Sequence, residues 1–168
     1  MGAITRTLAN NLTTGLGVGG KVLQAVETND NTHISQSNNT NYSEINTTIT
    51  PSSTSSKIVV MVSLGGVSHS STLDSAYIIE RAISGGATTN IQVGQSATRN
   101  CTFLGTHNTG GGEGISAQCT LMDSPNTTSA VTYKVYGHIN GGSWVLNKRG
   151  QDTTSSAGSR MVLMEVGG

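Results

Sequence analysis

The sequence predicts an all-β protein, a jelly-roll-like β-sandwich preceded by an extended N-terminal arm. Charged residues make up only 11% of the chain, against about 25% in an average globular domain, and Ser, Thr, Asn and Gly take up the difference. After residue 20, short stretches of alternating or continuous apolar residues recur, separated by clusters of turn-forming residues. Strands joined by turns give this pattern, and no stretch has the length and period of an ordinary helix.

The first twenty residues form a segment of a different kind. Their apolar residues are scattered, and a cluster of glycines just before residue 21 separates them from the rest of the chain. Such a segment cannot close a core by itself, and the glycines act as a flexible joint. We therefore expect a docking arm at residues 1–20 and a β domain at residues 21–168. The arm residues expected to contact another protein are Ile4, Arg6, Leu8, Leu12 and Leu16.

Short strands are expected one after another through the β domain. Residues 44–50 alternate clearly, with Ile45, Thr47 and Ile49 on one face, and Pro51 ends this strand because proline cannot donate to a sheet. The expected strands are residues 21–28, 32–37, 44–50, 57–64, 76–83, 90–94, 98–104, 115–122, 130–140, 143–147 and 161–166. The expected core residues are Ile58, Val60, Val62, Ile91, Val93, Val131, Val135 and Leu163.

Two of these strands, residues 57–64 and 161–166, are apolar on both faces. A continuous apolar run indicates a central strand that is covered on both sides. Since a strand in a sandwich needs only one buried face, the additional apolar side chains predict that subunits pack against one another. The side chains concerned are Val59, Met61, Val162 and Met164.

The two cysteines, Cys101 and Cys119, are equally distant in sequence from Gly110. A hairpin centred on that glycine would place them opposite each other, at a distance that a disulfide can span. A protein made in the cytosol keeps its thiols reduced, and two small buried side chains are then expected instead. The sequence favours the reduced pair and leaves the disulfide open.

No catalytic or metal-binding motif stands out in the sequence. The loop at residues 105–114 has three consecutive glycines but lacks the Lys-Ser/Thr ending and the following helix of a phosphate-binding loop, so we expect an exposed hairpin tip. The four histidines share no metal-ligand spacing, and no Gly-x-Ser-x-Gly elbow occurs. We expect a protein with no cofactor, no bound metal and no catalytic residues, which is not an enzyme.

Three residues are candidates for contact with a ligand. Trp144 is the single tryptophan, and aromatic faces stack on sugars, although a lone tryptophan more often fills a core or an interface. His107 and Glu113 belong to the glycine-rich loop at residues 105–114. Together with residues 65–74, this loop would contact the ligand if the chain were a receptor-binding module.

The charge balance argues against two classes of partner. Nine basic residues match nine acidic ones, so no field of one sign attracts nucleic acid or an anionic membrane. No stretch is apolar over the length of a membrane span, and the first twenty residues contain no signal-peptide core. We expect no nucleic-acid partner, no membrane insertion, and synthesis in the cytosol without export.

Several segments of the chain resemble parts of known proteins. GAITRTLANNLTTG (residues 2–15) is similar to an N-terminal segment of structural proteins of marine tailed bacteriophages. GKVLQAV (20–26) and ITPSSTSSKIVVMVS (49–63) resemble the opening of a compact β domain in phage fibre and virion proteins, and LMDSPNTTSAVTYKVY (121–136) and SRMVLMEV (159–166) resemble its end. Domains of this kind are similar to the jelly-roll heads of the C1q and tumour necrosis factor type, which assemble as trimers.

This resemblance implies a virion structural protein, assembled in the host cytoplasm, whose arm docks on other virion proteins and whose head forms a homotrimer. A capsid decoration protein and a short tail or head fibre both need an arm and a head, so both remain open. The alternative function is a receptor-binding module for a host surface glycan or protein. A depolymerase would be a third class, which the length and composition of the chain disfavour.

Overall fold

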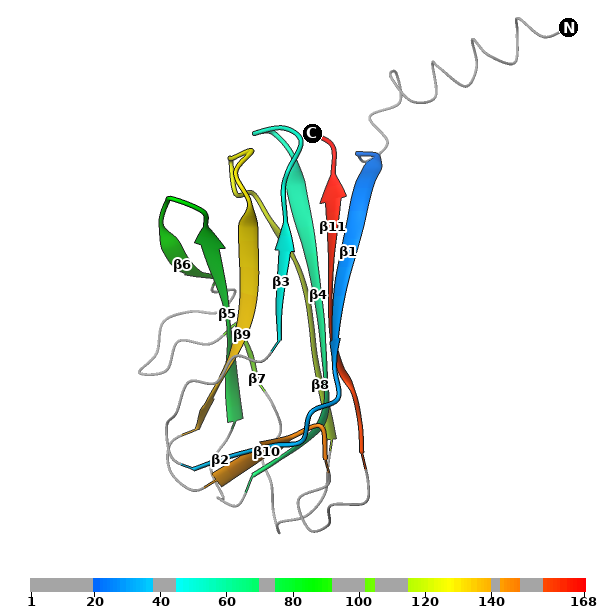
Figure 1. The fold of residues 1–168 in the computed structure, drawn as a ribbon, viewed down its shortest axis with the longest axis vertical. Coiled ribbons are helices and arrows are strands. Elements are labelled where there is room, and N and C mark those ends of the chain that lie inside the picture. The colour runs from blue at the N-terminus through cyan, green and yellow to red at the C-terminus, as the bar shows by residue number, and fades with distance from the viewer. Residues whose placement is uncertain are drawn as a thin grey trace, which may run out of the picture.

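The computed structural model describes residues 20–37, 45–69, 75–91, 102–104, 115–139, 143–148 and 156–168. Within these residues every regular element is a strand, and the strands form two antiparallel sheets that face each other (Figure 1). The predicted all-β sandwich is therefore confirmed for the described part of the chain, which contains no helix. Of the proposed arm, only Gly20 belongs to the described residues.

The larger sheet has six strands, in the order β1–β11–β4–β10–β2, with β8 pairing with β4 outside this path. Its central strand β4 pairs with β11 and β8 over most of its length, and its last two residues pair with β10. The strands of this sheet are β1 (Val22–Asp30), β2 (Ile34–Ser37), β4 (Lys57–His69), β8 (Ile115–Asp123), β10 (Ser143–Leu146) and β11 (Ser159–Val166).

The smaller sheet has five strands, in the order β3–β9–β5–β6, with β7 pairing with β5. In Figure 1 the long strands of both sheets stand nearly upright, whereas β2 and β10 run across the lower end of the sandwich. The strands of the smaller sheet are β3 (Asn46–Ile49), β5 (Ser75–Ile83), β6 (Thr88–Ile91), β7 (Phe103–Leu104) and β9 (Val131–Ile139).

The core lies between the two sheets, because side chains that alternate along a strand point to opposite faces. In the segment around β3, Ile45, Thr47 and Ile49 are buried while the residues between them are exposed, as the sequence predicts. Of the expected core residues, six are buried: Ile58, Val60, Val62, Val131, Val135 and Leu163. Ile91 is half-buried and packs against this core, and Val93 lies outside the described residues.

The described residues cover strand 57–64 on one face only, whereas the sequence predicts a cover on both faces. The strand is central, as predicted, but only its inner face is buried between the sheets. On its outer face Met61 is 40% exposed and Val59 is half-buried. No described element packs over that face, because the second layer covers only one side of a two-layer sandwich.

The hairpin that would join residues 98–104 to residues 115–122 does not occur among the described residues. β8 pairs with β4 in the larger sheet, and Cys119 lies opposite Val62. β7 pairs with β5 in the smaller sheet. The two segments therefore belong to different layers. Cys119 is a free thiol, and Cys101 lies outside the described residues.

The two ends of the described chain meet at one end of the sandwich. The backbone N–H of Gly167 donates to the carbonyl of Lys21 at 2.9 Å. Figure 1 shows the start of β1 and the C-terminus together, at the end opposite β2 and β10. A strand rises by about 3.3 Å per residue, so the nine residues of β1 separate this end from Asp30 by roughly 30 Å.

Candidate functional site

The outer face of the larger sheet, which points away from the smaller sheet, carries an unusual set of side chains. The register places outward-facing residues of β1, β11, β4 and β8 in rows across the sheet. One row is Ala25, Met164, Val59 and Met122, and the next is Glu27, Val162, Met61 and Thr120. A third row is Asn29, Arg160, Ser63 and Gln118.

Six residues of the first two rows form an outer apolar patch, consisting of Ala25, Val59, Met61, Met122, Val162 and Met164. Met122 is 58% exposed and Met61 is 40% exposed, while the valines and Met164 are half-buried by their neighbours. Contiguous exposed apolar side chains on a sheet mark a contact surface more often than a solvated one. The patch is bordered by charges of both signs, from Lys57 and Glu27.

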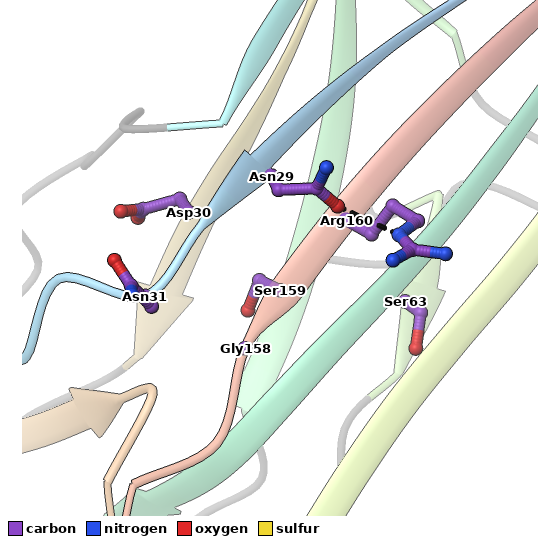
Figure 2. A pocket seen from close by; sticks show the side chains of 7 residues that line it. All are labelled: Asn29, Asp30, Asn31, Ser63, Gly158, Ser159 and Arg160. Atoms are coloured by element: carbon purple, nitrogen blue, oxygen red, sulfur yellow. Dashed lines mark hydrogen bonds between the residues drawn. The ribbon is translucent and has the colours of Figure 1, made fainter.

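The third row borders a polar groove, which we call the Arg160 groove (Figure 2). It has a volume of about 570 Å³ and lies where β1 ends and β11 begins. Its lining residues are all polar or glycine, namely Asn29, Asp30, Asn31, Ser63, Gly158, Ser159 and Arg160. The groove therefore lies beside the apolar patch on the same face, toward the end of the sandwich that is remote from Gly20.

The side chain of Arg160 lies over this groove. Its Nε donates to Oδ1 of Asn29 at 2.7 Å, and the same Nε lies 4.0 Å from a carboxylate oxygen of Glu27. Figure 2 shows Asn29 and Arg160 turned toward each other, with Asp30 and Asn31 on the side of Ser159 that is away from Arg160. The side chain of Arg160 is 61% exposed, so its terminal nitrogens can reach a bound molecule.

A buried polar network fixes the turn that carries Asp30. Asn147 is fully buried, and its Nδ2 donates to Oδ2 of Asp30 at 3.2 Å and to the carbonyl of Thr32 at 3.0 Å. Its Oδ1 accepts a hydrogen bond from Oγ of Ser159 at 2.5 Å. The carboxylate of Asp30 also accepts from the backbone N–H of Thr32 at 2.9 Å. The groove is therefore built on a rigid floor rather than on a free loop.

The same network explains two glycines in β4. The Oγ of Ser159 accepts from the backbone N–H of Gly65, and the N–H of Asn147 donates to the Gly65 carbonyl. A Cβ on Gly65 would lie 2.5 Å from the carbonyl of Gly158, so only glycine allows this approach. Gly66 has a φ of 56° in the left-handed region, where the strand is irregular between Leu64 and Val67.

A second polar cluster lies at the opposite end of β11. Glu165 is fully buried, and its Oε1 accepts hydrogen bonds from the backbone N–H and the Oγ of Ser52, at 2.7 and 2.6 Å. Its Oε2 accepts from Nε2 of Gln24 at 2.6 Å. Burial alone would raise the pKa of Glu165, but these hydrogen bonds outweigh it and lower the pKa to about 2. The cluster is fully paired and shielded, so its role is structural.

A third cluster connects the two sheets. Nη1 of Arg81 in β5 lies 2.9 Å from both carboxylate oxygens of Asp123 in β8, and the Tyr133 hydroxyl in β9 donates to Asp123 at 2.7 Å. Burial, the hydrogen bond to Asp123 and its charge raise the pKa of Tyr133 far above its ordinary value. The Tyr133 hydroxyl therefore stays protonated at neutral pH. It holds the two sheets together through its hydrogen bond to Asp123 and does not act as a base.

Among the described residues, no group of three or more His, Cys, Asp or Glu side chains could hold a metal ion. The His33 ring meets only the Ser156 hydroxyl, at 2.7 Å and on the surface. Burial raises the pKa of the Cys119 thiol, which makes it a poor nucleophile.

Most of the site residues expected from the sequence lie outside the described residues. These are the arm residues Ile4, Arg6, Leu8, Leu12 and Leu16, and the loop residues His107 and Glu113. Trp144 is placed on β10, where it pairs with Gln36 of β2 and His69 of β4. Sequence reasoning missed the Arg160 groove, because Asn29, Asp30 and Asn31 have the composition of an ordinary turn.

The sequence matches no protein-family model and no curated protein. In the described part of the chain, no helix has the length and apolar character that crossing a membrane requires.

Proposed function

We propose that the chain is a structural protein of a tailed-bacteriophage virion, with an N-terminal arm that docks on other virion proteins and a head that forms a homotrimer. The observation that carries this proposal is the outer apolar patch. Three of the segments that resemble phage proteins include the first part of β1, the first part of β4, and β11, which are neighbours in the sheet that carries the patch. The patch is thus made chiefly by these segments.

The pairing order supports the jelly-roll interpretation. Strands of one sheet follow the order β1–β11–β4–β8, and strands of the other follow β3–β9–β5–β6. The chain passes repeatedly from one sheet to the other, so that strands far apart in sequence become neighbours, as in Greek-key jelly rolls. This order favours a head of the C1q and tumour necrosis factor type.

A second copy of the chain is the occupant that fits the outer apolar patch. Burial of apolar surface contributes roughly 25 cal/mol per Å², so covering Met61 and Met122 is favourable. The chain has a net charge of zero at pH 7, so copies do not repel each other strongly. The border of the patch holds both Lys57 and Glu27, which allows charges of opposite sign to meet between copies.

The oligomeric state tests this proposal directly. Light scattering at micromolar concentration should give three times the chain mass of 17.3 kDa. The double substitution Met61→Asp and Met122→Asp should give a folded protein of single-chain mass, because it places charges in the patch. Thr128→Asp, at an exposed position between β8 and β9, should remain trimeric. A monomeric wild-type protein, or a trimer that survives the double substitution, would contradict the proposal.

Virion attachment through the arm needs a separate experiment. Deleting residues 2–18 should leave a soluble, folded head that is no longer incorporated into phage particles. Incorporation at normal copy number would place the attachment in the β domain instead. An electron-microscopy reconstruction of the particle would then distinguish a capsid decoration protein from a short fibre.

A further inference from the structure

We propose that the Arg160 groove is a binding site for a neutral saccharide. The volume of about 570 Å³ falls in the range of about 300–1,000 Å³ that small-ligand sites occupy. The hollow has a clear origin in the sequence. Gly158 and Ser63 are small, and they lie beside the longer side chains of Asn29 and Arg160.

The chemistry of the lining selects the class of ligand. Asp30 and Arg160 provide one negative and one positive charge, and Asn31 provides an amide that both donates and accepts. A polyanion would meet the carboxylates of Asp30 and Glu27, and a cation would meet the guanidinium of Arg160. A hydroxyl group donates and accepts at once, so a ligand rich in hydroxyl groups can use both kinds of partner.

The hydrogen bonds already present leave capacity for such a ligand. Each carboxylate oxygen of Asp30 accepts one hydrogen bond, from Thr32 and Asn147 respectively, and has room for a second. Arg160 uses its Nε toward Asn29, which leaves its terminal nitrogens for a ligand oxygen. Because the Asn147 network holds Asp30 in place, little ordering is required on binding.

Val162 and Met61 lie one row from Arg160 and Ser63 on the same face, but they belong to the outer apolar patch and do not line the groove. The saccharide assignment therefore rests on the polar lining alone.

The position of the groove is consistent with recognition of an external molecule. Asp30 lies at the far end of β1 from Gly20, where the proposed arm joins the head. If the arm faces the particle, as the proposed function requires, the groove lies toward the outer end of the head. The saccharide assignment itself depends only on the groove and not on the virion role.

Binding of the full-length protein to an array of neutral and acidic oligosaccharides tests the inference, with affinities then measured by calorimetry for the neutral oligosaccharide that binds. Gly158→Phe should fill the groove and weaken binding at least tenfold. A Cβ at this position has only the Asp30 carbonyl near it, at 3.8 Å, so the backbone at this position leaves room for a side chain to begin. Asn31→Ala and Arg160→Ala should weaken binding several-fold without filling the groove.

Lys57→Ala is the matched control, since it removes a charge from the same face away from the groove, and its affinity should equal that of the wild type. The inference is overturned by an absence of binding to every oligosaccharide, by binding to acidic members alone, or by unchanged affinity in all three groove variants. Should Gly158→Phe unfold, the other two variants decide the outcome. Binding of the array to the double variant Met61→Asp and Met122→Asp, which should be monomeric, separates the two proposals. Asp30, Asn31 and Arg160 are intact in this variant, so it should still bind the oligosaccharide even though the trimer is lost.

Discussion

Replacing Glu165 by glutamine removes a negative charge from a buried position while keeping the size of the side chain. The carboxylate accepts two hydrogen bonds from Ser52 and one from Gln24. A glutamine can keep its oxygen toward Ser52, but its NH₂ group then faces the NH₂ group of Gln24, and two donors oppose each other. Turning the Gln24 amide would break its hydrogen bond to the Thr50 carbonyl, which is 2.7 Å long.

The size of the effect follows from these contacts. A hydrogen bond to a charged group contributes about 1 kcal/mol more than a neutral one. The two bonds from Ser52 each lose roughly this amount, and the bond from Gln24, at about 2 kcal/mol, is lost. We therefore expect Glu165→Gln to lower the free energy of unfolding by about 3–4 kcal/mol, which corresponds to about 10 °C in Tm for a chain of this length.

The effect should depend on pH in a defined direction. The pKa of Glu165 is lowered from 4.5 to about 2 in the folded protein. A lowered pKa contributes stability that is complete above the unfolded pKa and is lost as the pH falls through the folded one. The Tm difference between the wild type and Glu165→Gln should therefore be constant near neutral pH. It should become smaller as the pH falls from 4.5 to 2.

Thermal unfolding followed by circular dichroism measures these differences. Glu27→Gln is the matched control, because the side chain of Glu27 is 54% exposed. Its substitution should lower the free energy of unfolding by less than about 1 kcal/mol, so Tm should change little. A Glu165→Gln variant as stable as Glu27→Gln would refute the reasoning. So would a Tm difference that stays constant down to pH 2.

Two further predictions concern the other polar clusters. Asn147 is buried with a φ of 61°, so urea unfolding should rank stability as wild type, then Asn147→Gly, then Asn147→Ala, with about 1 kcal/mol between the two variants; an alanine variant at least as stable as the glycine variant would contradict this. Asp123→Asn should cost about 2–3 kcal/mol because it weakens the bridge from Arg81 and the acceptor of Tyr133. In a double-mutant cycle with Tyr133→Phe, the two losses should be non-additive by at least about 0.5 kcal/mol, and strict additivity would show that the two residues do not act together.

The strands could be predicted from the sequence because their signals are local. Alternation at Ile45, Thr47 and Ile49 and the apolar run of β4 depend only on neighbours in the chain. The pairing of those strands is not local. Symmetry about Gly110 suggested a hairpin between β7 and β8, but the two strands lie in different sheets, because sequence spacing does not say which sheet a strand joins.

The candidate site was less predictable for the same reason. Asp123 comes just before a Ser-Pro-Asn turn, and nothing in its sequence neighbourhood indicates a distant partner, yet its carboxylate reaches Arg81 and Tyr133 across the sandwich. The groove combines the end of β1 with Ser63 and the start of β11, three segments that are remote in sequence. Only the outer apolar patch could be anticipated, because apolar residues on both faces of β4 and β11 are visible in the sequence alone.

The segments that resemble phage proteins include the residues of one buried cluster but not one wall of the Arg160 groove. Gln24, Ser52 and Glu165 belong to three different resembling segments, and they meet in one buried cluster. Residues that meet in this way determine how β1, the turn before β4, and β11 come together, so the resemblance is a statement about architecture. One wall of the Arg160 groove, Asn29 to Asn31, lies outside all of these segments. The resemblance therefore concerns how these strands come together and carries no information on what the groove binds, and substitutions in that wall are the direct way to learn it.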